Sequence, residues 1–240
     1  MAQHIGRKEL KKDEIAETLA HGAEAVISHQ RLVWIVGGAA LAVVLVVVGW
    51  RFYTERQTVK AAAALEDAMQ VFQARIRPVG EPEQPGEITY VDEKNKYEDA
   101  AKKFAQVAQK YSRTWPGQMA RYYAGLSDER LGRYDEAQKW LQQVEAIGDA
   151  ELAALARFQR AQVYEKTGKG EQAAKLYQQL IARPATLVPK PLALLALADH
   201  YRKNNPQEAA KLYNQIKSEF ADTSLAEEAE TRLQLLRPKT

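Results

Sequence analysis

Residues 161–180 read AQVYEKTGKGEQAAKLYQQL, and this stretch decides the fold class. Its second half carries Gly170, Ala173, Tyr177 and Leu180 at offsets of 0, 3, 7 and 10 residues. Because an α-helix has about 3.6 residues per turn, these four residues lie on one face of a helix. A small residue at a fixed place on a buried face lets a neighbouring helix approach closely. The stretch therefore predicts a helix that packs against other helices.

The same pattern occurs three more times, and the starting positions of the four copies step by 37, 36 and 36 residues. The other copies are Tyr97, Ala100, Phe104 and Val107; Tyr134, Ala137, Leu141 and Val144; and Pro206, Ala209, Tyr213 and Ile216. Ahead of three copies, a small residue stands seven positions before a turn residue, in the pairs Gly125 and Gly132, Ala161 and Gly168, and Ala198 and Asn205. Glycine and asparagine tolerate the left-handed conformation that ends many helices, so we expect it at these three turns. A period held in this way predicts stacked two-helix repeats.

These residues resemble the tetratricopeptide repeat (TPR), a helix–turn–helix unit that stacks into a solenoid. The third repeat carries the resemblance best, through Ala161, Tyr164 and Gly168, whereas the second has Asp128 where tyrosine is usual. The resemblance implies an all-α fold with TPR-like repeats over residues 94–240. It also implies a first repeat helix within residues 51–77 and a capping helix near residues 224–236.

An apolar segment precedes the repeats. Residues 32–50 (LVWIVGGAALAVVLVVVGW) form a run of 19 residues without a charged side chain. At about 1.5 Å per residue, such a helix spans the roughly 30 Å hydrocarbon core of a bilayer. Arg31 and Arg51 flank the run, and Trp34 and Trp50 lie near its ends, where aromatic rings favour the headgroup layer. A cleaved signal peptide fits less well, because 31 residues precede the run and it exceeds the usual apolar length. We predict a single uncleaved transmembrane helix.

Two further segments flank this region. Residues 1–31 form an N-terminal tail, in which residues 7–30 predict an amphipathic helix with one apolar face made of Ile15, Leu19, Ala23 and Val26. One interpretation is that this helix binds a membrane surface or a protein partner. The other is that it is a weak, solvent-exposed helix that precedes the membrane segment. Residues 78–93 (PVGEPEQPGEITYVDE) contain three prolines and no helical periodicity, which predicts an exposed acidic loop.

Composition excludes several classes of function. The chain has 240 residues, no cysteine and a net charge of +3, from 34 basic and 31 acidic side chains. Disulfides, thiolate metal sites and thiol catalysis are therefore excluded, and so small a charge does not favour nucleic-acid binding. Phosphate-binding loops, nucleophile elbows and HExxH motifs do not occur in the sequence. His200 is the only histidine after the apolar run, and we expect an ordinary surface or edge histidine there. The sequence predicts no enzyme, no cofactor and no metal.

A candidate partner-binding surface follows from repeat geometry, because the first helix of each repeat lines the concave wall in folds of this kind. Apolar candidates stand six and three residues before each small residue: Met119, Tyr122, Leu155, Phe158, Leu192 and Leu195. Basic candidates stand five residues after it: Arg130, Lys166 and Lys203. An apolar strip beside a basic row suits an extended or helical peptide with an acidic edge. The alternatives are that the strip packs between repeats and that the basic row is merely solvated.

At the level of the whole chain, a short tail, one apolar segment ending in GWRFYTERQ (residues 49–57), an alanine-rich helix and a few repeats resemble the bacterial YfgM-type inner-membrane family. The resemblance implies a cytoplasmic N-terminus, a periplasmic repeat domain, and association with the Sec translocon and periplasmic chaperones. Charge alone barely orients the chain, with five basic residues in 1–31 against three in 51–70. We expect a membrane-anchored scaffold for protein–protein interactions. The alternatives are a cytoplasm-facing assembly scaffold and an enzyme with an unrecognised site.

Overall fold

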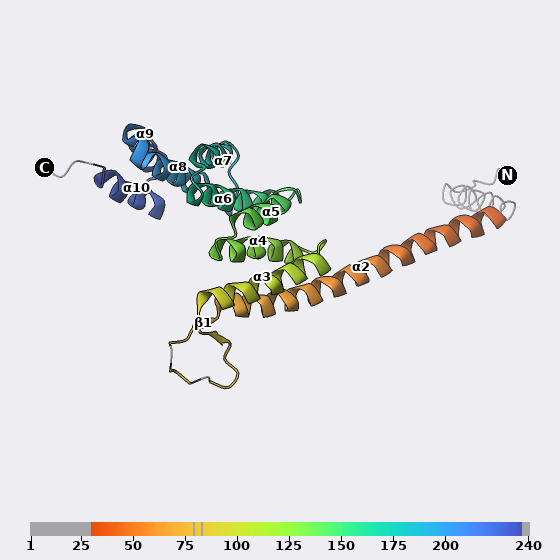
Figure 1. Cartoon of the computed structure of the whole chain (residues 1–240). Helices are drawn as coiled ribbons and strands as arrows, with labels where there is room; N and C mark the ends of the chain where they lie inside the picture. Colours follow the sequence, from red (N-terminus) through yellow and green to blue (C-terminus); the bar gives the residue numbers. More distant parts are fainter. Residues whose placement is uncertain (1–29, 79, 83, 237–240) are drawn as a thin grey trace, which may run out of the picture. The chain divides into compact units, whose positions relative to one another are not determined.

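The computed structural model describes residues 30–78, 80–82 and 84–236, with side chains from Trp34 onward (Figure 1). The chain divides into two compact units, Met1–Arg56 and Gln57–Thr240, and we call the second unit the repeat domain. The predicted all-α repeat fold is confirmed. The amphipathic helix predicted over residues 7–30 lies outside the described residues, apart from Gln30.

The first described helix, α2 (Gln30–Gln73), contains the predicted membrane segment. Its apolar side chains are exposed, with Trp34 at 75% and Val46 at 70% of their accessible surface. None of its most apolar window is buried. In the part of the chain that the structure describes, α2 is the one helix that is long and apolar enough to cross a membrane.

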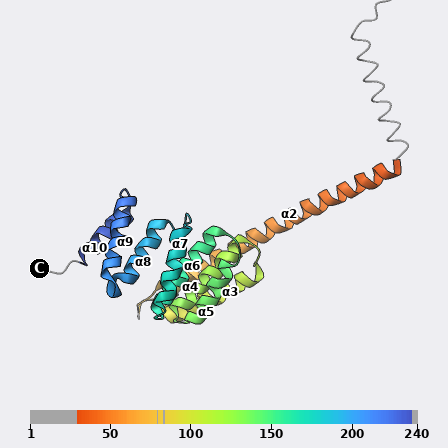
Figure 2. The same cartoon turned by 90° about the horizontal axis from the view of Figure 1, so that it is seen from above.

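The repeat domain continues with eight helices between residues 93 and 234, packed one against the next (Figure 2). They are α3 (Glu93–Lys110), α4 (Trp115–Arg130), α5 (Tyr134–Glu145), α6 (Ala150–Lys166), α7 (Gly170–Ala182), α8 (Lys190–Asn204), α9 (Pro206–Glu219) and α10 (Ser224–Gln234). The turns between them are short, so neighbouring helices run antiparallel. Helices α4 to α9 form the second, third and fourth repeats, with α4, α6 and α8 as first helices and α5, α7 and α9 as second helices. Helix α10 closes the stack.

The periodic sequence pattern marks the core of this stack. Residues at offsets 3, 7 and 10 are buried in all four copies, and Ala137, Ala173 and Ala209 expose none of their surface. The small residues of the first helices also sit at close contacts. A Cβ built on Gly125 would lie 3.0 Å from Cγ of Leu141 in α5. Close packing between helices therefore explains why small residues recur at these places.

Two of the three predicted left-handed turns are observed. Gly132 and Gly168 have φ angles of 74° and 72°, and each follows the end of a first helix. The prediction for Asn205 is wrong, because its φ is −146°. One residue separates α8 from α9, whereas three separate α4 from α5 and α6 from α7. Asn205 therefore caps α9 and accepts a hydrogen bond from the Glu208 N–H at 3.2 Å.

The end of α2 packs into the first repeat. Ala61, Ala68 and Val71 share a core cluster with Phe104 and Val107 of α3, although an acidic loop separates the two helices in sequence. This cluster closes one end of the stack.

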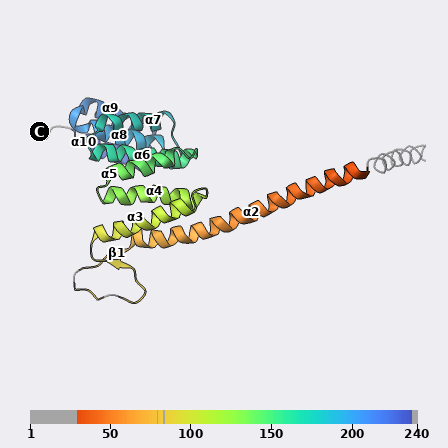
Figure 3. The ribbon, with the colours of Figure 1, turned by 45° about the vertical axis from the view of Figure 1, so that its right-hand side comes forward.

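The loop itself contains a short pair of strands that the sequence pattern did not predict (Figure 3). Strand β1 (Arg75–Ile76) pairs in parallel with β2 (Thr89–Tyr90). Helix α2 ends at Gln73, four residues before the boundary expected at 77, and residues 75 and 76 form β1 instead. Pro78 disfavours helical backbone at residue 77. Strands of two residues are too short to show an alternating pattern.

Candidate functional site

The apolar candidates lie between helices. Tyr122 and Leu195 are buried, with 8% and 5% of their surface exposed. Met119 packs against the cluster that contains Tyr122, while Leu155 and Leu192 are half-buried against neighbouring clusters. The Phe158 ring lies 5.8 Å from the Tyr177 ring of α7. These six side chains contribute to packing between helices, and the four half-buried ones also present surface.

The basic candidates are exposed at the ends of the first helices and have three different surroundings. Lys166 pairs with Glu129 of the preceding repeat, with Nζ 2.6 Å from Oε1. The Arg130 guanidinium lies over the Tyr97 ring at 5.9 Å. Lys203 lines a surface cavity. Of the three cations, Lys166 thus forms an ion pair between two repeats.

Three acidic residues that sequence reasoning missed connect successive first helices. Glu129 accepts the Lys166 ammonium, and Glu165 lies 2.7 Å from Nδ1 of His200. Asp199 continues the series through an ion pair with Arg232 of α10. A signal was available, because Glu129 and Glu165 each stand four residues after the small residue of their helix. We call Glu129, Glu165 and Asp199 the acidic series.

The sequence predicts an ordinary surface or edge histidine at position 200, and the structure places it at the contact between α6 and α8. The His200 side chain is only 13% exposed and bridges α8 to α6 through Glu165. It also covers the start of α7, where a Cβ built on Gly170 would lie 2.6 Å from the His200 Cε1 atom. His200 is therefore a contact residue between two repeats, and the glycine makes room for its ring.

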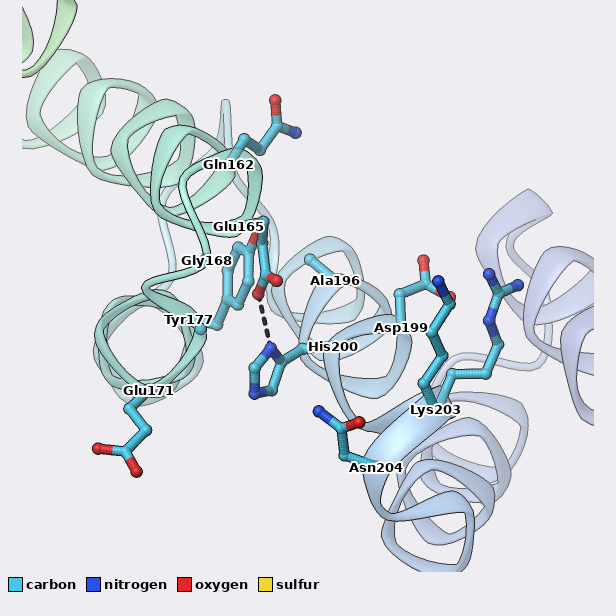
Figure 4. A pocket seen from close by; sticks show the side chains of 12 residues that line it. Gln162, Glu165, Gly168, Glu171, Tyr177, Ala196, Asp199, His200, Lys203 and Asn204 are labelled. Carbon is cyan, nitrogen blue, oxygen red and sulfur yellow. Dashed lines mark hydrogen bonds and ion pairs between the residues drawn. The ribbon is translucent and has the colours of Figure 1, made fainter. Parts of the chain in front are cut away.

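A surface cavity of about 690 Å³ lies between α6, α7 and α8 (Figure 4). Gln162, Asp199 and Lys203 reach it from the first helices, and Glu171 reaches it from the start of α7. The rest of its lining is Glu165, Gly168, Gly170, Tyr177, Ala196, His200, Arg202 and Asn204. Both signs of charge meet in this cavity, which suits a polar or charged peptide segment.

Several titratable side chains of the cavity are engaged with other residues of the chain. Its histidine and one of its glutamates are paired with each other, and Asp199 accepts a hydrogen bond from the Tyr213 hydroxyl at 2.6 Å. Burial raises the pKa of the Tyr177 phenol, so the hydroxyl stays protonated and is not a base near neutral pH. The described residues contain no cluster of histidine and acidic side chains suited to a metal ion.

Asp128 occupies the place where a tyrosine is usual in the second repeat, and its burial changes its titration. It is 6% exposed, and this burial raises the pKa of its carboxyl above the ordinary value. The Arg133 guanidinium, 3.7 Å from Oδ1, opposes that shift without cancelling it. The folded state thus favours the protonated carboxyl.

We expect Asp128→Asn to stabilise the repeat domain near neutral pH. Because the folded pKa is raised, the stability that Asp128 contributes is complete below its unfolded pKa of about 3.9 and is lost as pH rises through the folded value. The neutral amide avoids that loss. Urea unfolding followed by circular dichroism from acid to neutral pH measures the difference. We expect the variant's advantage to vanish in acid, whereas a less stable variant at neutral pH would mean that the Arg133 pair outweighs burial.

Comparison with known proteins assigns this architecture to a family. A family model described as tetratricopeptide repeat-like domain matches residues 30–184, which is more than half of the chain. The chain belongs to the tetratricopeptide repeat-like family. A second model, described as tetratricopeptide repeat, matches residues 158–223. A comparison with curated proteins found no match.

Solved structures support the same fold. The chain is similar to the crystal structure of Podosopora anserina putative kinesin light chain nearly identical TPR-like repeats, and to a form of that protein with a single substitution. Each has 18% sequence identity and a TM-score of 0.54, and covers 74% of this chain; 85% and 84% of the two solved chains are matched. At this identity the likeness shows the fold alone. Tetratricopeptide repeats indicate a scaffold for protein–protein interaction, and their fold is typically not enzymatic.

Proposed function

We propose that this chain is a single-pass membrane protein whose repeat domain binds protein partners beside the bilayer. The observation that carries the proposal is the exposed apolar stretch of α2, which directly precedes a repeat domain. In water, such a stretch would leave large apolar side chains such as Trp34 and Val46 in contact with solvent. The match to the tetratricopeptide repeat-like model begins at residue 30 and so includes this stretch.

The cavity between α6, α7 and α8 is the proposed partner site. Arg202 and Lys203 are exposed on its wall, and neither forms an ion pair with another residue that the structure describes. A partner segment with acidic side chains would pair with them. Half-buried Phe158, whose ring lies 5.8 Å from the ring of Tyr177 in the cavity lining, offers apolar surface nearby. The acidic series and His200 keep the first helices in register around the site.

The side of the membrane is part of the proposal. The resemblance to the YfgM-type family supports a cytoplasmic N-terminus, a periplasmic repeat domain and partners in the Sec translocon or among periplasmic chaperones. The alternative is a cytoplasm-facing scaffold for assembly of another complex, since the basic residues flanking the anchor differ little in number.

Protease added to spheroplasts tests the orientation. We expect the repeat domain to be digested and the N-terminal tail to be protected. A repeat domain that survives in intact spheroplasts but is digested after lysis would replace the periplasmic proposal with the cytoplasmic alternative. A chain released from membranes by alkaline carbonate would refute anchoring itself.

Site-specific photo-crosslinking tests the partner site. A photo-crosslinker at Gln162 or Lys203, on the cavity wall, is expected to capture protein partners. The matched control is Gln178, which is exposed on α7 and is not part of the cavity lining. Equal capture from all three positions, or capture from Gln178 alone, would contradict a partner site in the cavity.

A further inference from the structure

One edge of the repeat domain carries exposed apolar side chains that the proposed partner site does not use. Trp115 exposes 56% of its surface, Leu187 52% and Val59 65%. All three lie where first helices begin or where the chain enters the repeat domain, and the turns before α4, α6 and α8 lie on the same side in both views (Figures 1 and 3). We call residues 57–60, 110–115, 146–150 and 183–190 the Trp115 edge.

Basic side chains accompany these apolar ones. Lys60, Lys110 and Arg113 are exposed on the Trp115 edge, and none of them forms an ion pair within the described ranges. Residues 100–127 contain five basic side chains and no acidic one, although the chain as a whole is nearly balanced. Lys110 and Arg113 therefore have no carboxylate in the same stretch of sequence to neutralise them.

Local hydrogen bonds hold Trp115 at this edge. Thr114 caps α4: its Oγ1 accepts from the Gly117 N–H at 3.2 Å and donates to the Tyr111 carbonyl at 2.9 Å. The turn between α3 and α4 is therefore tight, and it leaves the indole pointing outward rather than into the core.

A second device holds Leu187. The Glu151 carboxylate at the start of α6 accepts the backbone N–H groups of Thr186 and Leu187 at 2.9 and 2.8 Å. These bonds lower the pKa of Glu151, so its charge persists over the physiological range. Because the Glu151 carboxylate is engaged in these bonds, it does not pair with a basic side chain of the edge. The bonds also hold the loop that contains Leu187.

The link between the apolar segment and this edge is short. Gln57, the first residue of the repeat domain, follows Trp50 by seven residues, which span at most about 25 Å even when fully extended. Exposed tryptophan favours the headgroup layer, and lysine and arginine near a surface pair with anionic lipid phosphates. A protein partner would not be confined to the edge where the chain leaves the membrane.

We propose that the Trp115 edge rests on the surface of an anionic phospholipid bilayer, with Trp115 and Leu187 at headgroup depth and Lys60, Lys110 and Arg113 against lipid phosphates. The proposal rests on the membrane anchor of the proposed function. Its consequence concerns access to the cavity. The turns that line the cavity, including Gly168 and Asn204, lie at the other end of the first helices, which is about 24 Å away for a helix of 16 residues. The cavity then opens away from the bilayer.

Because the chain has no cysteine, one substitution creates a unique labelling site. The full chain is reconstituted in vesicles of zwitterionic and anionic phospholipid, with a fluorophore on Ser112→Cys beside Trp115 or, as the matched control, on Lys169→Cys in the turn between α6 and α7. Brominated lipids quench a fluorophore only on contact. We expect quenching at residue 112 to exceed that at residue 169 several-fold, and to fall when Trp115→Ala is added. Equal quenching at the two positions would overturn the proposal.

Charge provides an independent measurement. Replacing Lys60, Lys110 and Arg113 by glutamine should weaken contact of the edge by about fivefold for each charge removed, and raising salt should act in the same direction. Quenching at residue 112 that is indifferent to both lipid charge and these substitutions would contradict the role of the basic side chains. Flotation of the same vesicles separates the two proposals: a chain that floats without quenching at 112 retains its anchor and refutes only the edge contact.

Discussion

Gly117→Ala is expected to destabilise the repeat domain by about 3 kcal/mol, although alanine is ordinarily the better helix former. A Cβ at this position would lie 2.0 Å from the Tyr111 carbonyl oxygen and 2.6 Å from its carbon. Both atoms are backbone, so no side chain can rotate away and the turn between α3 and α4 has to open. That carbonyl also accepts hydrogen bonds from the N–H and the hydroxyl of Thr114, each at 2.9 Å. The change therefore disturbs the cap of α4 as well.

Urea unfolding of the variant measures this cost, and Gly132→Ala is the matched control. Gly132 has a positive φ, but a Cβ built on it would meet no atom within 4 Å, so alanine there brings only left-handed strain, of roughly 1–2 kcal/mol. We expect Gly117→Ala to be the more damaging change, with faster amide hydrogen exchange in residues 110–117. A Gly117→Ala protein as stable as the unchanged chain would mean that the turn relaxes without loss.

Local periodicity explains how much of the fold was predictable. Ala173, Tyr177 and Leu180 share a helix face because of their spacing alone, and they are buried. The conformation of the turns was harder to predict from residue type. The left-handed conformation is found at Gly132 and Gly168 but not at Asn205, where the turn is shorter and the same residue caps the next helix. The strands β1 and β2 depend on two segments meeting across a loop, which no local pattern reveals.

The candidate site was harder to predict for the same reason. Which cations face a partner depends on which carboxylates the adjacent repeat supplies, and Glu129 and Lys166 are 37 residues apart. Sequence spacing located the first helices and their exposed ends correctly. It did not show that Glu129 holds Lys166, or that Glu165 holds His200 over the start of α7. Both pairings appear only when the repeats are stacked.

Phe104→Ala should cost about 3–5 kcal/mol, the range expected when a buried aromatic side chain is truncated. Phe104 exposes none of its surface. Its ring contacts Phe72 of α2 edge-on at a centroid distance of 5.9 Å and stacks on Tyr123 of α4 at 5.3 Å. One side chain thus joins three helices at the end of the stack that follows the anchor.

The distribution of this loss along the chain tests the repeat architecture, because each repeat of a solenoid contacts mainly its neighbours. In Phe104→Ala, amide exchange should accelerate in residues 57–73, α3 and α4, while α8–α10 stay protected. Leu180→Ala is the matched variant, since Leu180 is equally buried in the cluster of α6–α8. In that variant we expect amide exchange to accelerate around this cluster, while residues 57–73, α3 and α4 stay protected. Uniform acceleration in both variants would instead mean that the stack unfolds as one cooperative body. Because residues 57–73 belong to the helix that continues from the anchor, the Phe104 variant should also lose the lipid contact beside Trp115, while the Leu180 variant should keep that contact.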